Sequence, residues 1–219
     1  LENLDTDGSI LAVCAHEDGV LFYDISNPSN PVLSSILSTD NSWSVALKDN
    51  LVFIADENNI RIVDINNINS PQLLEVIATT NAIKDIIVDL NFLYVALGSD
   101  GVALYEITDD SLQLLDDYNT STLANRISAF NGRLAIADWD DVEVIEWDGN
   151  QLTQVGYKNT GNRTMAIAAT MHDYIYSIEW ASVQSFEYGE VDGPDIDLST
   201  WELNYPYVES GASYSLSIN

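Results

Sequence analysis

Basic side chains are scarce in this chain of 219 residues. It has 7 lysines and arginines against 35 aspartates and glutamates, which gives a formal net charge of −28. Binding to nucleic acid needs clusters of basic residues, and binding to anionic lipid surfaces needs the same sign of charge. The composition therefore excludes nucleic acid and anionic membranes as expected partners. The acidic excess predicts a solvated, solubilising surface or, alternatively, carboxylates that bind divalent cations.

Cysteine and histidine are almost absent as well. The single cysteine, Cys14, rules out an internal disulfide, and because it lies in an alternating apolar run we expect a buried, inert thiol. Only His16 and His172 are candidate bases near neutral pH, and they fall in different parts of the chain. No serine lies in a nucleophile elbow, no histidine pair has zinc-ligand spacing and no glycine loop resembles a phosphate cradle. Whether the chain is an enzyme stays open, and the balance is against it.

Long apolar runs are missing too. No run reaches the length of a transmembrane helix and no signal peptide is present, so we expect no direct membrane insertion. The first residue is Leu1 and not methionine. We therefore expect the chain to be part of a longer, multidomain protein.

What the chain does contain is a six-residue pattern that recurs five times. The copies end in an acidic residue followed by one large side chain, and they span Val20–Ile25, Ile60–Ile65, Val102–Ile107, Val142–Trp147 and Val183–Tyr188. Measured on the acidic residue, the steps are 40 (24 to 64), 42 (64 to 106), 40 (106 to 146) and 41 (146 to 187). A period of about 40–45 residues with short strands is typical of propeller blades.

Each repeat has the pattern of four short strands bounded by Asn, Asp, Gly and Pro. In the second repeat we expect strands at 44–47, 51–55, 60–65 and 73–78. No helical periodicity of useful length competes with this pattern. The sequence predicts an all-β fold, a β-propeller of about five recognisable four-stranded blades, closed or partial. The propeller spans 1–190, with repeats near 1–42, 43–81, 82–123, 124–162 and 163–190, and 191–219 form a linker and a truncated module.

The two ends of the repeat array are incomplete in this interpretation. The first strand of the first repeat is either missing or lies within 1–4, and the fifth repeat has no fourth strand before a linker at 189–194. If five blades are the full number, residues 1–8 or the tail after Gly189 should supply a closing strand.

The repeats resemble the LVIVD-repeat family of β-propellers. Ile60–Ile65 matches the motif that gives the family its name, the segment from Asp24 to Pro31 resembles its proline turn, and Leu51–Asp56 resembles the strand before the motif. The resemblance covers roughly residues 10–190 and is strongest in the first two copies. It implies an extracellular or surface-attached propeller, in a family mostly without an assigned activity.

A second resemblance begins at Pro194. The segments 194–199, 203–213 and 216–219 are similar to the opening of an immunoglobulin-like β-sandwich of the choice-of-anchor D type. Such modules occur in secreted multidomain proteins. The match covers about two strands, and because an incomplete sandwich cannot bury its sheet face, we expect this tail to be poorly ordered or to lie on the propeller.

The turns and the repeated acidic position have expected structural roles. The pairs between the second and third strands are typical of tight turns with positive φ; they are Asp18-Gly19, Asn58-Asn59, Asp100-Gly101 and Asp140-Asp141. The repeated acidic residue recurs in every blade, whereas a catalytic residue is needed once. We therefore expect it to accept hydrogen bonds from backbone N–H groups of the following turn.

The hairpins between second and third strands should share one end of the propeller with the loops that join one blade to the next. That end gathers carboxylate, amide and hydroxyl oxygens, which suit calcium or sugar hydroxyls; ordinary turn chemistry is the alternative. Trp139 and Trp180 are candidate platforms for stacking a sugar ring. The residues predicted to bind a ligand here are Asp18, Asp56, Asp100, Asp138, Trp139, Asp140 and Glu179.

Three functions are compatible with these features. The favoured one is a non-enzymatic extracellular or cell-surface module for binding, adhesion or display, with a protein or glycan ligand on the acidic face. The second is an architectural domain that spaces other modules. The third is a secreted propeller hydrolase or lyase that acts on polysaccharide through two carboxylates. Propellers host all three, so the fold alone does not separate them.

Overall fold

The regular structure of the described residues consists of β-strands. The computed structural model describes residues 1–109, 111–189 and 200–203, and for the last four residues only the backbone. The first sheet, blade 1, contains β1 (Leu4–Asp7), β2 (Ile10–Cys14), β3 (Val20–Asp24) and β4 (Val32–Leu37). The strands pair in chain order and antiparallel.

Blades 2 and 3 repeat this meander. Blade 2 contains β5 (Ser42–Lys48), β6 (Leu51–Asp56), β7 (Asn59–Asp64) and β8 (Gln72–Ala78). Blade 3 contains β9 (Asp85–Asp89), β10 (Phe92–Ala96), β11 (Val102–Ile107) and β12 (Leu112–Tyr118). The four strands expected in the second repeat are confirmed to within a few residues at each end.

Blades 4 and 5 form one continuous sheet of six strands. It contains β13 (Ala124–Phe130), β14 (Arg133–Trp147), β15 (Leu152–Ala169), β16 (Tyr174–Glu179), β17 (Val183–Glu187) and β18 (Thr200–Leu203). The long strand β14 covers the second and third strands of blade 4. The long strand β15 is the fourth strand of blade 4, pairing with β14, and then the first strand of blade 5, pairing with β16.

Both ends of the array differ from the expectation. The first strand of blade 1 exists and runs from Leu4 to Asp7, where it pairs with β2. The prediction that blade 5 lacks a fourth strand was wrong, because β18 pairs antiparallel with β17. The tail after Gly189 thus supplies this strand. The other residues assigned to the immunoglobulin-like module, 190–199 and 204–219, lie outside the described residues, so that assignment stays a prediction.

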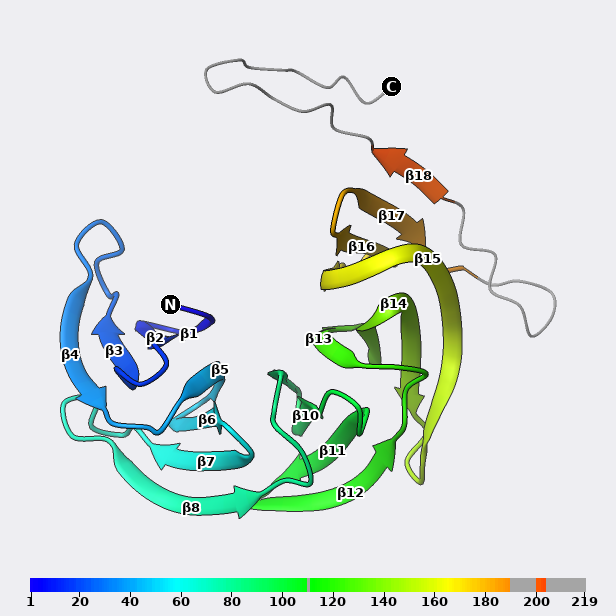
Figure 1. The fold of residues 1–219 in the computed structure, drawn as a ribbon. Helices are drawn as coiled ribbons and strands as arrows, with labels where there is room; N and C mark the ends of the chain where they lie inside the picture. Colours follow the sequence, from blue (N-terminus) through cyan, green and yellow to red (C-terminus); the bar gives the residue numbers. More distant parts are fainter. Residues whose placement is uncertain (110, 190–199, 204–219) are drawn as a thin grey trace.

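The sheets are arranged radially around a common centre (Figure 1). First strands such as β1, β5 and β13 lie toward the middle, and β4, β8 and β12 lie on the outside of the arc. The arc is open between blade 1 and the strands β16 and β17 of blade 5. Sheets that repeat radially in this way form a β-propeller. The predicted fold class is confirmed.

The hydrophobic core is divided among the interfaces between neighbouring blades. Phe22 packs with Ile54 between blades 1 and 2, and Phe53 packs with Leu93 between blades 2 and 3. Cys14 belongs to the first of these clusters, and burial raises the pKa of its thiol to about 12. The expected buried thiol is confirmed. Each blade therefore depends on the next one to cover its sheet face.

Hydrogen bonds between first strands fix the register of one blade on the next. In each case a side chain accepts a backbone N–H that lies 41 or 42 residues further along the chain. Asp5 accepts at 2.8 Å, Ser44 at 3.2 Å, Asp85 at 3.1 Å and Ser128 at 2.9 Å. Because Asp85 is buried, desolvation raises the pKa of its carboxyl group, against the opposing effect of its hydrogen bonds.

The repeated acidic residue has its expected role in the first two blades. Asp24 accepts the N–H of Ser26 at 2.8 Å, and Asp64 accepts the N–H of Asn66 at 2.7 Å. In blade 4 this role falls to Asp148, two residues beyond the repeated position, which accepts the N–H groups two and three residues ahead of it. These backbone hydrogen bonds lower the pKa of Asp24 and of Asp148.

The hairpins between second and third strands confirm the expected turns only in part. Gly19 and Gly101 have φ of 89° and 71°, as their Asp-Gly pairs predict. In blades 2 and 4 the positive φ falls on Glu57 (56°) and Trp139 (58°), not on the pairs Asn58-Asn59 and Asp140-Asp141. The hairpin of blade 2 is one residue shorter than that of blade 1, because Leu51 pairs with Asp64 whereas Ile10 pairs with Asp24. The equivalent residues of blades 1 and 3, His16 and Gly98, also have positive φ, so the longer hairpins differ in having a second left-handed residue, Gly19 or Gly101.

Gly101 provides a test of this hairpin geometry. A Cβ atom at Gly101 would lie 2.1 Å from the carbonyl oxygen of Tyr118, whereas a Cβ at Gly132, which also has positive φ, meets nothing within 4 Å. We expect Gly132→Ala to cost about 1–2 kcal/mol for the left-handed conformation and Gly101→Ala to cost clearly more, because backbone must also move. Urea denaturation of both variants measures the difference. Equal losses of stability in the two variants would contradict the close approach between Gly101 and the carbonyl oxygen of Tyr118.

Candidate functional site: a carboxylate cluster on the hairpin face

The hairpins between second and third strands contact the loops that lead into their own blades. In blade 2, Asp56 at the end of β6 accepts the N–H groups of Asp40 at 3.1 Å and Asn41 at 2.6 Å. In blade 4, Asp138 accepts the N–H of Thr122 at 2.7 Å. The prediction that these hairpins and loops share one end of the blades is confirmed. We call this end the hairpin face.

In blade 2 the buried carboxylate on this face has a basic partner. Asp56 has no exposed surface, and Arg61 on β7 donates from Nε to its Oδ2 at 2.5 Å. The guanidinium also donates to Asp40 at 3.0 Å. A buried carboxylate is stable only when it is paired or well hydrogen-bonded, and Asp56 is both.

In blade 4 the same position is crowded with carboxylates. Asp138, Asp141 and Glu143 all lie on β14 and are 0%, 1% and 1% exposed. One oxygen of each lies within 4.8 Å of one oxygen of each of the others. Among the described residues, none of the ion pairs of the chain involves these three carboxylates. Three negative charges thus share one buried site.

Neutral donors satisfy only part of this cluster. Glu143 accepts from the hydroxyl of Tyr118 at 2.7 Å, the side chain of Gln154 at 3.1 Å and the N–H of Ser121 at 2.8 Å. The Ser121 hydroxyl lies 2.8 Å from both Asp138 Oδ2 and Asp141 Oδ2, but it has one proton and donates to one of them at a time.

Two carboxylate oxygens in the cluster are left over. Oδ1 of Asp138 and Oδ1 of Asp141 are buried and have no hydrogen-bond partner in the described part of the chain. Burial, the largest cause, raises the pKa of Asp141 to about 6; the charges of Asp138 and Glu143 add to the rise, and hydrogen bonds from Ser121 and Tyr157 oppose it. The cluster is short of positive charge.

Next to this cluster lies an aromatic and basic group. The Arg163 guanidinium stacks over the ring of Trp139, with its central carbon 4.8 Å from the ring centroid. The backbone carbonyl of Arg163 accepts the N–H of Trp180 at 3.0 Å, and the side chain of Trp180 is 73% exposed. The hairpins of blades 4 and 5, together with Arg163 on the strand β15, thus bring two tryptophans and one arginine together.

The structure divides the residues predicted to bind a ligand into separate groups. Asp138, Trp139 and Asp140 lie together in the hairpin of blade 4, and Glu179 is buried at the start of the blade 5 hairpin, where Ser182 donates to it. The remaining three belong to three other hairpins: Asp18 is exposed, Asp56 is paired with Arg61, and Asp100 is half-buried beside Asn81. Ligand binding by these residues stays a prediction.

Two members of the cluster, Asp141 and Glu143, were not among the predicted residues. The signal that identifies them is an alignment of the repeats on the repeated acidic position. Arg61 lies three residues before Asp64, and Glu143 lies three residues before Glu146. The position that holds a cation in blade 2 holds a carboxylate in blade 4.

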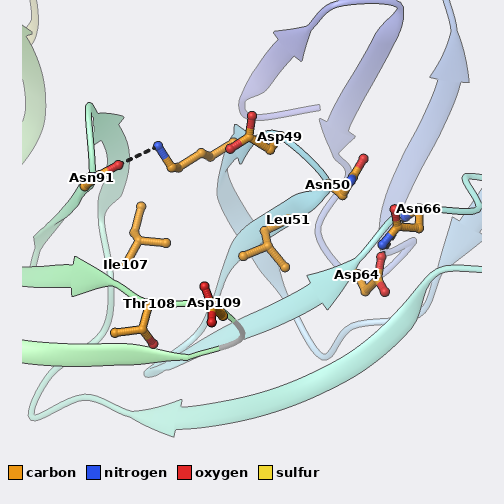
Figure 2. A pocket seen from close by; sticks show the side chains of 10 residues that line it. Asp49, Asn50, Leu51, Asp64, Asn66, Asn91, Ile107, Thr108 and Asp109 are labelled. Atoms are coloured by element: carbon orange, nitrogen blue, oxygen red, sulfur yellow. Dashed lines mark hydrogen bonds between the residues drawn. The ribbon is translucent and has the colours of Figure 1, made fainter.

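A cleft of about 440 Å³ lies at the opposite end of the strands, between blades 2 and 3 (Figure 2). Its wall includes Asp49, Asp64 and Asp109, and Lys48 donates to Asn91 Oδ1 at 3.0 Å, the dashed line in Figure 2. Most of its side chains belong to exposed turns. It is separate from the carboxylate cluster.

Comparison with known families supports the interpretation of the repeats. The segments 15–39 and 41–79 match the family model described as LVIVD repeat. Over these two segments the chain is similar to LVIVD repeats. The matched segments correspond to the hairpin and outer strands of blade 1 and to the whole of blade 2. No curated protein matches the chain.

Solved structures resemble the chain in fold. A structure of U3-55K matches with a TM-score of 0.71 at 13% identity over 91% of this chain and 65% of that chain. A chain of the mitotic checkpoint complex matches with a TM-score of 0.71 at 10% identity, over 94% of this chain and 66% of that chain. The computationally designed Ika8 protein matches with a TM-score of 0.65 at 14% identity, over 80% of this chain and 54% of that chain. This chain thus spans two thirds or less of each. At such identities the likeness shows the fold alone.

Proposed function

We propose that the chain is a non-enzymatic binding module of an extracellular or cell-surface protein. Its ligand, a glycan or a protein, lies on the hairpin face of blades 4 and 5. The observation that carries the proposal is Trp180, whose side chain is 73% exposed beside the stacked pair of Trp139 and Arg163. Exposed tryptophan next to arginine is typical of the energetically dominant residues of binding sites, and a tryptophan ring also stacks on sugar rings.

The charge of the chain favours particular ligands. With a formal net charge of −28 it attracts basic surfaces and repels acidic ones, and it does not repel neutral ones. In the described part of the chain no helix has the length and hydropathy to span a membrane. The proposed extracellular location can be tested by sequencing the DNA on both sides of the region that encodes this chain. The location predicts that this DNA encodes a signal peptide and a surface anchor.

A hydrolase or lyase is not favoured by the same geometry. The raised pKa of Asp141 suits a general acid, but Asp138, Asp141 and Glu143 are at most 1% exposed. A catalytic acid must reach the bond that it protonates. A polysaccharide cannot contact these groups without a rearrangement of the hairpin.

The binding role is tested by Trp180→Ala on a glycan array and on immobilised extracellular proteins. We expect the wild-type chain to bind, and the variant to bind at least about tenfold more weakly with unchanged stability, because the removed ring is exposed. Leu90→Ala is the matched control: Leu90 is 74% exposed in the β9–β10 turn, at the opposite end of the strands. Equal binding by both variants, or no binding by the wild-type chain, would contradict the proposal.

A further inference from the structure

Two hairpins of the same chain share one length and differ in charge. The segment from Asp56 to Asp64 has the same spacing as the segment from Asp138 to Glu146, eight residues in each case. The buried aspartate that ends the second strand is therefore equivalent in the two blades, and so are Arg61 and Glu143. Both aspartates are fully buried, and both accept backbone N–H groups from the loop that enters the blade.

The equivalent sites differ in what balances the charge of the buried aspartate. In blade 2 the Arg61 guanidinium lies against the aspartate. In blade 4 that position is Glu143, and Asp141 replaces the neutral Asn59, so two negative charges are added and one positive charge is lost. In blade 5, whose hairpin has the same length, the position is neutral Gln184. Blade 4 alone of these three hairpins gathers three carboxylates.

A positive charge in the place of the guanidinium would balance this cluster. The buried Oδ1 atoms of Asp138 and Asp141, unpartnered among the described residues, are oxygens that an ion can coordinate. Carboxylate and hydroxyl oxygens are hard ligands and suit Ca²⁺ or Mg²⁺. Mg²⁺ keeps several water molecules in its coordination shell, whereas Ca²⁺ accepts a shell made largely of protein oxygens. An almost fully buried cluster favours Ca²⁺.

We propose that Asp138, Asp141 and Glu143 bind a divalent cation, Ca²⁺ in preference to Mg²⁺, in the position that the Arg61 guanidinium fills in blade 2. The cation ties the hairpin of blade 4 to the loop at Ser121 and Thr122. It supports the hairpin that carries Trp139. The site does not depend on the binding role proposed above, because its own ligands are buried and Trp180 is exposed.

The test is a Ca²⁺ titration by calorimetry and by thermal unfolding, on protein freed of metal with a chelator. For the wild-type chain we expect one saturable site and a saturable rise in Tm, since a ligand of the native state stabilises it. Mg²⁺ should bind more weakly. Glu143→Gln removes one charged ligand and should weaken Ca²⁺ binding at least about tenfold.

Glu143→Arg places the residue of blade 2 in blade 4. It should abolish Ca²⁺ binding and leave the metal-free protein at least as stable as the metal-free wild type. The matched control is Asp100→Asn, which removes a carboxylate from the hairpin of blade 3, where Leu97 and Ala103 replace Asp138 and Glu143. This control should bind Ca²⁺ like the wild type.

Three results would overturn the site. One is the absence of both a heat of binding and a rise in Tm at millimolar Ca²⁺. Another is a rise in Tm that does not saturate and that is the same in all variants and the same with Mg²⁺ as with Ca²⁺. Such a rise would come only from screening of the acidic surface. The third is unchanged Ca²⁺ affinity in Glu143→Gln. Loss of glycan or protein binding in Trp180→Ala leaves all three readouts unaffected, so the two proposals fail independently.

Discussion

Replacing Phe53 with alanine is expected to lower the free energy of unfolding by about 3–5 kcal/mol, the range for a large aromatic side chain removed from a core. Phe53 has no exposed surface and lies in the cluster that joins blades 2 and 3, together with Ile62 and Leu93. The cavity would open between two blades rather than inside one. Urea denaturation, with the slope compared between wild type and variant, measures the loss.

Tyr176 is the matched control, because it lies three repeats of 41 residues after Phe53 at the equivalent position of blade 5. The Tyr176 side chain is 38% exposed, since blade 5 borders the opening of the arc (Figure 1). Tyr176→Ala should therefore cost less than about 1 kcal/mol. A loss as large as that of Phe53→Ala would mean that the face of blade 5 is covered in solution.

Replacing Arg61 with methionine is expected to lower the free energy of unfolding by about 3 kcal/mol. Removing one partner of a buried ion pair leaves the other charge uncompensated, which costs about 3–5 kcal/mol, and the 20% exposure of the Arg61 side chain places the loss at the lower end. Asp56 would keep its backbone hydrogen bonds and lose its counter-charge. Chemical denaturation at neutral pH measures the effect.

The double variant Asp56→Asn with Arg61→Met separates charge from packing. It has neither charge, so it should recover part of the stability that Arg61→Met loses. If Arg61→Met alone proved neutral, a buried aspartate on this face would need no positive partner. The case for a cation in blade 4 would then lose its basis.

The repeat period predicted most of the fold because a blade is a local structure. Each strand pairs with a neighbour in the sequence, so short apolar runs and Asp-Gly turns are sufficient to place strands such as β10 and β11. Two features escaped prediction for a physical reason. The strand β18 has only four residues and is defined by its pairing with β17, from which twelve residues separate it in the sequence. The left-handed residue of the shorter hairpins is Glu57 or Trp139, and neither residue type indicates positive φ.

The carboxylate cluster could be predicted only in part. The hairpin end of blade 4 was expected to be rich in oxygen ligands, and Asp138 was among the residues named. Glu143 belongs to the recurring motif, where alternation alone says only that it lies on the third strand. Its burial against Asp138 depends on the contact between the hairpin and the preceding loop, which brings in Tyr118 and Ser121. That contact joins blade 4 to the last strand of blade 3 and to the loop between the two blades, and it leaves no local pattern.

The most direct measurement is a crystal structure of the protein grown with Mn²⁺ in place of Ca²⁺, with anomalous diffraction recorded. The account predicts one strong anomalous peak among the carboxylates of Asp138, Asp141 and Glu143, and none beside Asp56, where the Arg61 guanidinium supplies the charge. A map with no peak in the blade 4 hairpin, or with a peak beside Asp56 instead, would contradict it.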